Sequence, residues 1–99
     1  MKSYTIILQG IFNENKKESK EFLEYSKRSN ANIEAYKGVV KRKYIIEENL
    51  VQNEKPCFVI IVDFPSKDDA KNAFVSEEYL SIIPLRNLIF RDVKILITK

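Results

Sequence analysis

The chain has 99 residues, of which 44% are hydrophobic and 31% are charged, and its formal net charge is +3. This length suits one domain over residues 1–99, and the composition is typical of a globular protein rather than a disordered one. A single cysteine excludes an internal disulfide, and the absence of histidine excludes histidine-ligated haem and His-based catalytic triads. The sequence also lacks a Gly-rich phosphate loop and the Cys and His pairs of a structural zinc site, so we expect neither a cofactor nor a metal.

The first predicted element is a strand over Tyr4–Phe12, which is rich in β-branched and aromatic residues. The apolar part of this N-terminal segment is too short to span a membrane and lacks the cleavage pattern of a signal peptide. We therefore expect a cytoplasmic protein with no membrane partner.

A helix is predicted next. Asn15 followed by Glu18 fits a capping box, and the helix is expected to end near Tyr36, with Gly38 as its left-handed terminator. Between these ends, a stripe at helical spacing faces the core. That stripe comprises Phe22, Tyr25, Ser29 and Ile33, with Ser26 as a further member.

Two more strands follow the helix. Val39–Glu47 predicts the second strand, Glu48–Lys55 reads as a polar loop, and Cys57–Phe64 predicts the third strand, which is the most apolar stretch of the chain.

The last third of the sequence predicts further helices and a strand. Ser66 starts an N-cap pattern, and Ser76 starts a second one that is followed by one or two helical turns. Pro84 is expected to interrupt this helical region, and Asp92–Thr98 predicts the final strand. The buried stripe of the first of these helices comprises Ala70, Ala73 and Phe74.

The predicted order is β-α-β-β-α-β, which is the ferredoxin-like plan. We therefore predict an α+β domain in which a four-stranded antiparallel sheet carries two helices on one face.

The third strand predicts that the other face of this sheet is also buried. Neighbouring side chains of a strand point to opposite faces, and on an exposed face polar residues should predominate. Here both sets are apolar except for Asp63, and the first strand behaves similarly. One set comprises Phe58, Ile60, Val62 and Phe64, and the other Cys57, Val59, Ile61 and Asp63. A homodimer that packs two open sheet faces together is the simplest cover, although a ligand or another protein could serve.

RNA recognition is the alternative function for this topology, because RNA-recognition domains stack bases on aromatic rings of the open face. Val59 and Ile61 occupy the positions where such rings would lie, and Lys41–Lys43 is the only basic cluster. We therefore expect no nucleic-acid partner.

The stretch VDFPSKDDAKNAFVSEEYLSIIPLRN, residues 62–87, carries a family resemblance. It combines an acidic-Phe-Pro-Ser strand exit, a helix with paired alanines, a Ser-x-x-Tyr turn and a Leu-Arg soon after. The chain resembles, over nearly its whole length, a family of dimeric α+β barrels called domain of unknown function 1330.

The resemblance implies a sheet-to-sheet dimer with a pocket between helices and sheet. The wider fold group includes small monooxygenases, isomerases and dehalogenase- or decarboxylase-like proteins. Asp63 stands where the family usually has Glu, Lys43 where it has Arg, and Lys37-Gly38 keeps one of two glycines. Tyr79 and Arg86 match the family pattern.

Three residues are candidate catalytic groups. Asp63 could act as a general base, Tyr79 could donate a proton or a hydrogen bond, and Arg86 could hold an anionic substrate or an enolate-like charge. The structural alternatives are a solvated or ion-paired Asp63, a packing tyrosine and a surface ion pair. The candidate ligand-binding residues are Lys43, Gln9 and Tyr44.

Two hypotheses follow. The chain is either a cofactor-independent enzyme or binder of a small, perhaps anionic, molecule, or a non-enzymatic dimeric ligand-binding or interaction module. A cavity that reaches Asp63, Tyr79 and Arg86 together would favour the first.

Overall fold

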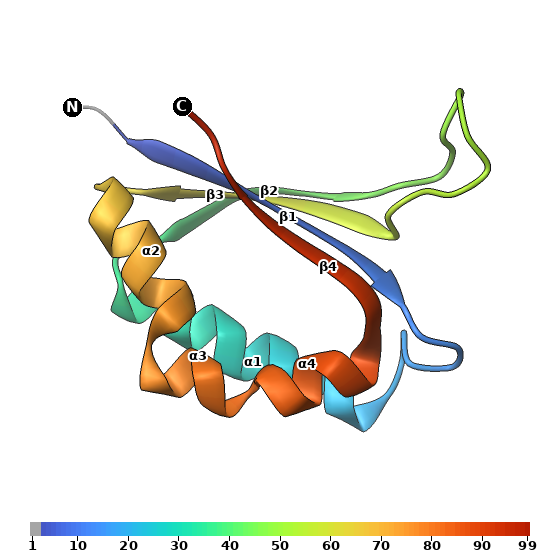
Figure 1. Cartoon of the computed structure of the whole chain (residues 1–99), viewed down its shortest axis with the longest axis horizontal. Coiled ribbons are helices and arrows are strands. Elements are labelled where there is room, and N and C mark those ends of the chain that lie inside the picture. The colour runs from blue at the N-terminus through green and yellow to red at the C-terminus, as the bar shows by residue number, and fades with distance from the viewer. Residues whose placement is uncertain (1–2) are drawn as a thin grey trace.

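The computed structural model describes residues 3–99 and contains one antiparallel sheet with the strand order β2-β3-β1-β4. The strands are β1 (Tyr4–Phe12), β2 (Val39–Ile45), β3 (Phe58–Phe64) and β4 (Phe90–Ile97). The helices are α1 (Lys20–Ala35), α2 (Lys67–Val75), α3 (Glu77–Ser81) and α4 (Ile83–Ile89). All of these helices lie on one side of the sheet (Figure 1), which confirms the predicted α+β, ferredoxin-like plan.

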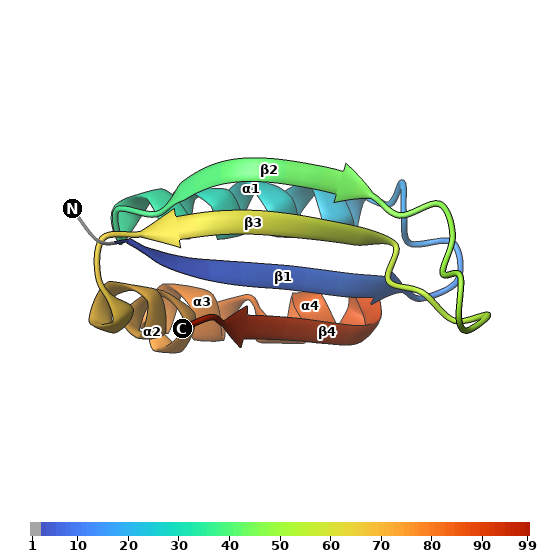
Figure 2. The ribbon, with the colours of Figure 1, turned by 90° about the horizontal axis from the view of Figure 1, so that it is seen from above.

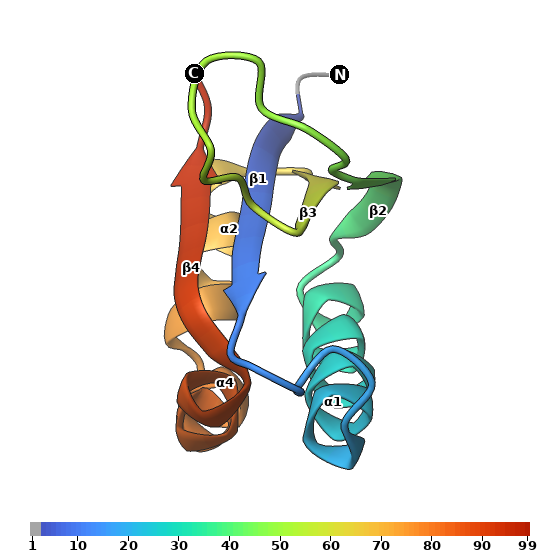
Figure 3. The same cartoon turned by 90° about the vertical axis from the view of Figure 1, so that its right-hand side faces the viewer.

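The helices form two groups beneath the sheet. Seen end-on, α1 runs below the β2 edge, whereas α4 lies below β4 (Figure 3). The opposite face of the sheet carries no helix (Figure 2). Within residues 3–99, none of the helices is long and apolar enough to cross a membrane.

Helix α1 begins later than its predicted cap. Its N-cap is Ser19, whose side chain accepts a hydrogen bond from the backbone N–H of Phe22 at 3.2 Å. Asn15, the predicted cap, instead adopts a left-handed turn with φ 65° in the segment that leads to the helix. The prediction was wrong because both Asn15 and Ser19 have cap chemistry, and Asn also tolerates left-handed conformations well.

The end of α1 is a Schellman motif. The backbone N–H of Gly38 donates to the Ile33 carbonyl at 2.8 Å, and the N–H of Lys37 donates to the Glu34 carbonyl at 2.9 Å. The left-handed residue is Lys37, with φ 69°, and not Gly38 as expected. Gly38 is required for another reason, because an added Cβ would lie 2.6 Å from Cγ2 of Ile33 and 2.7 Å from Cε1 of Phe64.

The predicted caps of the second helical region are confirmed. The Ser66 hydroxyl accepts from the N–H of Asp69, and the Ser76 hydroxyl accepts from the N–H of Tyr79. Helix α4 was not predicted, because a proline in a helical region usually marks a break. Pro84 lies in the first turn of α4, where its missing N–H costs no intrahelical hydrogen bond.

A β-bulge at Lys41 determines which residues of β2 face the helices. Val40 pairs with Val62, but the next pair is Arg42 with Ile61, so Lys41 is the extra residue. From this point the faces are exchanged relative to a regular strand, and Lys43 comes opposite Ile60, on the helix side.

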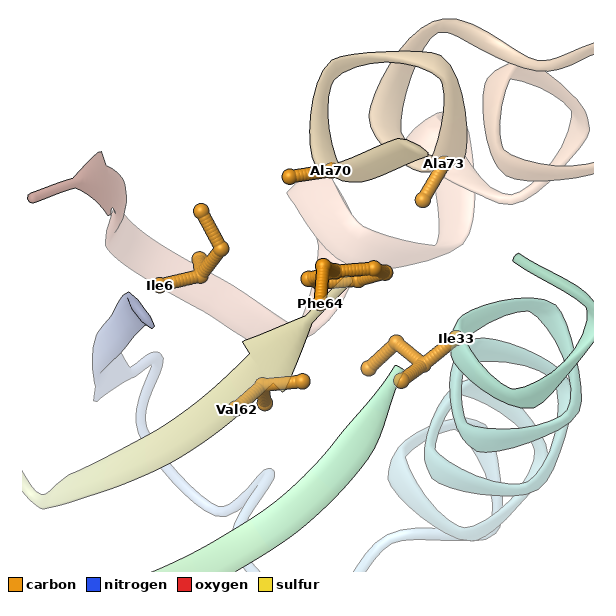
Figure 4. Packing of buried hydrophobic residues seen from close by; sticks show 6 residues of the cluster. All are labelled: Ile6, Ile33, Val62, Phe64, Ala70 and Ala73. Carbon is orange, nitrogen blue, oxygen red and sulfur yellow. The ribbon is translucent and has the colours of Figure 1, made fainter. Parts of the chain in front are cut away.

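The core lies between the sheet and the helices. One cluster joins β1 and β3 to α1 and α2, and its two alanines let α2 approach the sheet closely (Figure 4). Its buried members are Ile6, Ile33, Val62, Phe64, Ala70 and Ala73. A second cluster, at the other end of the sheet, is built on Phe58, Ile89 and Phe90 and is largely aromatic.

Candidate functional site

A cavity of about 790 Å³ lies between α1 and the helix-facing side of the sheet. This is the size of pocket that binds small molecules in proteins. Its walls are mainly apolar and draw on both core clusters. Among the lining residues are Leu8, Phe12, Phe22, Ile60 and Phe90.

The side chains on the inner face of α1 explain why this space is left open. Between Tyr25 and Ile33 the helix presents the short side chains of Ser26 and Ser29, both of which line the cavity. Serine side chains are short, so at these positions they leave space beside the helix that longer apolar side chains would occupy. The predicted core-facing stripe of α1 is therefore confirmed, but part of it lines a cavity.

Charged residues lie at the rim of the cavity. Lys17, Glu18, Glu34 and Lys43 all line it and are exposed to solvent. Because two are basic and two are acidic, the rim carries no net charge, while the walls further in are apolar.

A chain of polar groups lies at the inner wall of the cavity. The hydroxyl oxygens of Tyr25 and Tyr79 are 3.0 Å apart, and both residues line the cavity. Arg86 donates from Nη1 to the hydroxyl oxygen of Tyr79 at 3.2 Å, and its Cζ lies 5.7 Å from the centroid of the Tyr79 ring. Only 1% of Tyr79 is exposed.

Burial changes the acidity of Tyr25. Removal from water, strengthened by the neighbouring Tyr79, raises the pKa of the Tyr25 hydroxyl above its usual range. Tyr25 is therefore protonated at neutral pH and can donate a hydrogen bond.

Three of the six predicted site residues lie on the helix side of the sheet. Tyr79 and Lys43 line the cavity, and Arg86 contacts Tyr79 directly. Lys43 reaches the cavity because of the bulge at Lys41.

Asp63 lies elsewhere. Its neighbours Val62 and Phe64 are buried between the sheet and the helices. Side chains alternate along a strand, so Asp63 lies on the open face of the sheet. There its carboxylate accepts a hydrogen bond from the Thr5 hydroxyl at 2.7 Å. The expected joint site of Asp63, Tyr79 and Arg86 is therefore not formed within one chain, because the sheet separates Asp63 from the cavity.

Tyr44 and Gln9 also belong to the open face. Tyr44 pairs with Val59 and is 52% exposed. Gln9 pairs with Val59 and Lys94, and it borders both the cavity and a second hollow of about 270 Å³ beside the β2–β3 loop.

Sequence reasoning placed Tyr25 in the α1 stripe but did not consider it a site residue. The sequence did contain a signal for Tyr25. It lies close to Ser26 and Ser29, whose side chains are small, so its hydroxyl group could border unfilled space. For a metal, the part of the chain from residue 3 to 99 offers no group of three or more His, Cys, Asp or Glu side chains that could hold an ion.

Comparison with known proteins identifies the family and the fold. The family model described as domain of unknown function (DUF1330) matches residues 10–98. A protein of unknown function from Rhodopseudomonas palustris has a similar structure, with a TM-score of 0.80 and 16% identity over 98% of this chain and 81% of that one. No curated protein sequence matches the chain.

Two further solved structures share the fold. SnoaB, a cofactor-independent oxygenase from Streptomyces nogalater, has a TM-score of 0.68 and 13% identity over 100% of this chain and 93% of its own. A dimeric protein of unknown function with a ferredoxin-like fold, from Bacteroides fragilis, has a TM-score of 0.55 and 14% identity over 98% and 95%. Identities this low indicate a shared fold only.

Proposed function

The chain belongs to the DUF1330 family, and from that premise and its cavity we propose that it binds a small, largely apolar molecule between α1 and the sheet. The observation that carries the proposal is the cavity of about 790 Å³, whose apolar walls enclose a few convergent polar groups. Small-molecule sites commonly have this composition, since apolar walls supply affinity and polar groups fix orientation.

The polar residues would contact different parts of the ligand, according to their depth in the cavity. Tyr79, supported by Arg86, would supply a hydrogen bond at the inner wall, and Lys43 would interact with ligand groups near the rim. Because the rim charges cancel, a strongly anionic ligand has less support than a neutral one. The anionic ligand considered from the sequence is therefore the weaker form of this proposal.

A cofactor-independent reaction is compatible with the same site. Arg86 and Tyr79 could stabilise negative charge that develops on a ligand oxygen. SnoaB, which shares the fold, is a cofactor-independent oxygenase, and this lends the idea support by analogy alone.

Binding can be tested with N-phenyl-1-naphthylamine, a neutral probe whose fluorescence rises in apolar surroundings. We expect saturable binding by the wild-type chain. Ser26→Trp, which places a large ring in the cavity, should abolish the fluorescence increase, whereas Lys27→Trp, on the exposed side of α1, should leave it unchanged. No saturable binding, or equal binding by both variants, would overturn the proposal.

We also propose that a second copy of the chain covers the open face. An apolar row, Leu96–Ile7–Ile61, crosses three strands on this face. Leu96 is 42% exposed and Tyr44 nearby is 52% exposed. Soluble monomers seldom expose contiguous apolar surface of this kind, and a symmetric pair of sheets would remove it from water. The Bacteroides fragilis protein that shares the fold is described as dimeric, which supports a dimer by analogy. A dimer used only for interaction, without ligand binding, is the alternative function.

A further inference from the structure

The loop between β2 and β3, residues 46–57, rises above the open face at one end of the sheet. From the end of β2 it passes, on the side away from the helices, toward β4 and then returns to β3 (Figure 1, Figure 3). An ion pair holds it there, with Oε1 of Glu54 3.2 Å from Nη2 of Arg91 in β4. The loop therefore reaches from one edge strand of the sheet to the other.

The side chain of Asn49 fixes the shape of this loop. Its Nδ2 donates to the carbonyl of Glu54 at 2.9 Å, and its Oδ1 accepts from the backbone N–H groups of Val51 at 2.9 Å and Gln52 at 3.1 Å. These hydrogen bonds are closed within the loop, so it needs no partner to hold its form. Its tip is therefore presented in a preorganised conformation, which lowers the entropy lost on binding.

The tip of the loop combines apolar and acidic side chains. Leu50 is 89% exposed and Val51 is 90% exposed, so two aliphatic side chains extend into water. Glu47 and Glu48 precede them and are also exposed, and no basic residue occurs between positions 47 and 54. A partner for this tip must offer both apolar surface and positive charge.

Strand β2 of the same chain offers both. Lys41 and Arg42 are adjacent and exposed, and the large side chains of Tyr44 and Ile45 beside them are exposed as well. Arg42 pairs with Ile61, which places it on the open face of the sheet. The loop is apolar and acidic, whereas β2 is apolar and basic, so the two surfaces are complementary.

These two surfaces do not meet within one chain. The ion pairs among residues 3–99 involve other side chains, and the loop glutamates and the two basic residues of β2 take part in none of them. The loop also carries its tip away from β2 and is held toward β4 by the contact between Glu54 and Arg91. In a symmetric pair, however, a surface of one copy that fits a second surface of the same chain can make that contact twice.

The open face needs contacts from outside the sheet to hold a second copy. Its apolar row, Leu96–Ile7–Ile61, is bordered by the polar residues Asp63 and Gln9. A stable interface buries about 800 Å² on each partner, which is more than this row can supply. The loop lies on the same side of the sheet and extends the surface that a second copy can contact.

We infer that the β2–β3 loop of each copy packs on β2 of the other. Leu50 and Val51 contact the exposed apolar side chains of that strand, and the loop glutamates form ion pairs with Lys41 and Arg42 of the partner subunit. This inference rests on the proposed dimer and adds to it the segment that reaches across and the strand that receives it. The complementary charges determine which surfaces of the two copies come together.

Exchange of charge between the two surfaces tests the inference. The loop variant carries Glu47→Lys and Glu48→Lys, the strand variant carries Lys41→Glu and Arg42→Glu, and a combined variant carries all four changes. Dissociation constants of the dimer are measured by sedimentation velocity at low ionic strength, where screening is weak. Because every contact occurs twice in a symmetric pair, each variant alone should raise the constant by at least about tenfold, whereas the combined variant should return to within about threefold of wild type.

A matched control separates the pairing of these surfaces from net charge. Glu77→Lys together with Glu78→Lys makes the same change in net charge as the loop variant, at exposed positions of α3 on the helix side. This control should leave the dissociation constant of the dimer unchanged.

The apolar tip is tested separately. Leu50→Ser together with Val51→Ser should also weaken the dimer by at least about tenfold, because the aliphatic side chains no longer gain from burial against the partner. Leu23→Ser together with Val75→Ser shortens two exposed aliphatic side chains on α1 and α2 and should have no effect on the constant.

The outcomes separate this inference from the proposed dimer. If wild type is dimeric and Ile61→Asp dissociates it, but the loop and strand variants keep the wild-type constant, the inference is overturned and the dimer stands. If the loop and strand variants each weaken the dimer but the combined variant does not recover, the loop does not pair with β2, and the inference is again overturned. If wild type is monomeric, the dimer fails, and the inference fails with it.

Discussion

The hydroxyl oxygens of Tyr25 and Tyr79 lie 3.0 Å apart across the wall of the cavity, although 54 positions separate the two residues in the sequence. Tyr25 comes from α1 and Tyr79 from α3, so this contact joins the two groups of helices beneath the sheet. The Arg86 guanidinium completes the contact from α4. Three helices therefore place one set of polar groups at the inner wall.

The raised pKa of Tyr25 predicts a change in stability at high pH. Between the ordinary tyrosine pKa of about 10 and the raised value, the folded state keeps the proton while the unfolded state releases it. Folding stability should therefore fall as the pH rises through this window, by up to about 1.4 kcal/mol per pH unit from this one group. Urea unfolding of wild type and Tyr25→Phe between about pH 9 and 11 measures the difference.

The wild type should lose stability more steeply than Tyr25→Phe above about pH 10, whereas below about pH 9 the difference between them should not depend on pH. Parallel curves across the whole range would mean that Tyr25 ionises in the folded state as readily as in the unfolded one.

The end of α1 predicts opposite effects for two adjacent substitutions. Gly38→Ala should destabilise the fold by about 1–3 kcal/mol, because the new methyl group would overlap Ile33 and Phe64. Lys37→Gly should raise stability by up to about 1 kcal/mol, because it relieves a left-handed conformation with φ 69°. Thermal or urea unfolding measures both, and a neutral Gly38→Ala would contradict the packing that assigns this glycine.

The dimer proposal predicts that a charge in the apolar row dissociates the protein. Ile61→Asp would bury a carboxylate between two sheets, so the mass by light scattering at micromolar concentration should fall from twice that of the chain to that of one chain. Leu23→Asp makes the same chemical change at a side chain that is 67% exposed on α1, and it should remain dimeric. A wild-type protein that is monomeric at this concentration would refute the proposal.

The position of Asp63 predicts that it does not contribute to ligand binding in the cavity. Asp63→Asn keeps an oxygen that can accept from Thr5, and the sheet separates it from the cavity. Its affinity for N-phenyl-1-naphthylamine should stay within about twofold of wild type, a change below the value of one hydrogen bond. A large loss of affinity for the probe would contradict this prediction and would mean that Asp63 contributes to ligand binding.

Much of the architecture could be read from local patterns. The strand predicted over Cys57–Phe64, the Ser66 and Ser76 caps and the inward stripe of α1 all appear in the structure, because each depends on residues a few positions apart. Where two local signals competed, as for Asn15 and Ser19, the sequence could not decide between them. Pro84 was misjudged for a similar reason, since proline breaks a helix in its interior but fits its first turn.

The site depended on information that no local pattern contains. The sequence by itself determined the order of the four strands and the apolar character of both sheet faces, and the family resemblance made Tyr79 and Arg86 candidate site residues. Only the tertiary structure decided that Lys43 faces the cavity and Tyr44 does not, because one extra residue at Lys41 exchanges the faces of β2. Only the tertiary structure joined Tyr25 to Tyr79 as well. Strand register and helix docking arise from packing between distant segments, and these long-range contacts determine which side chains meet.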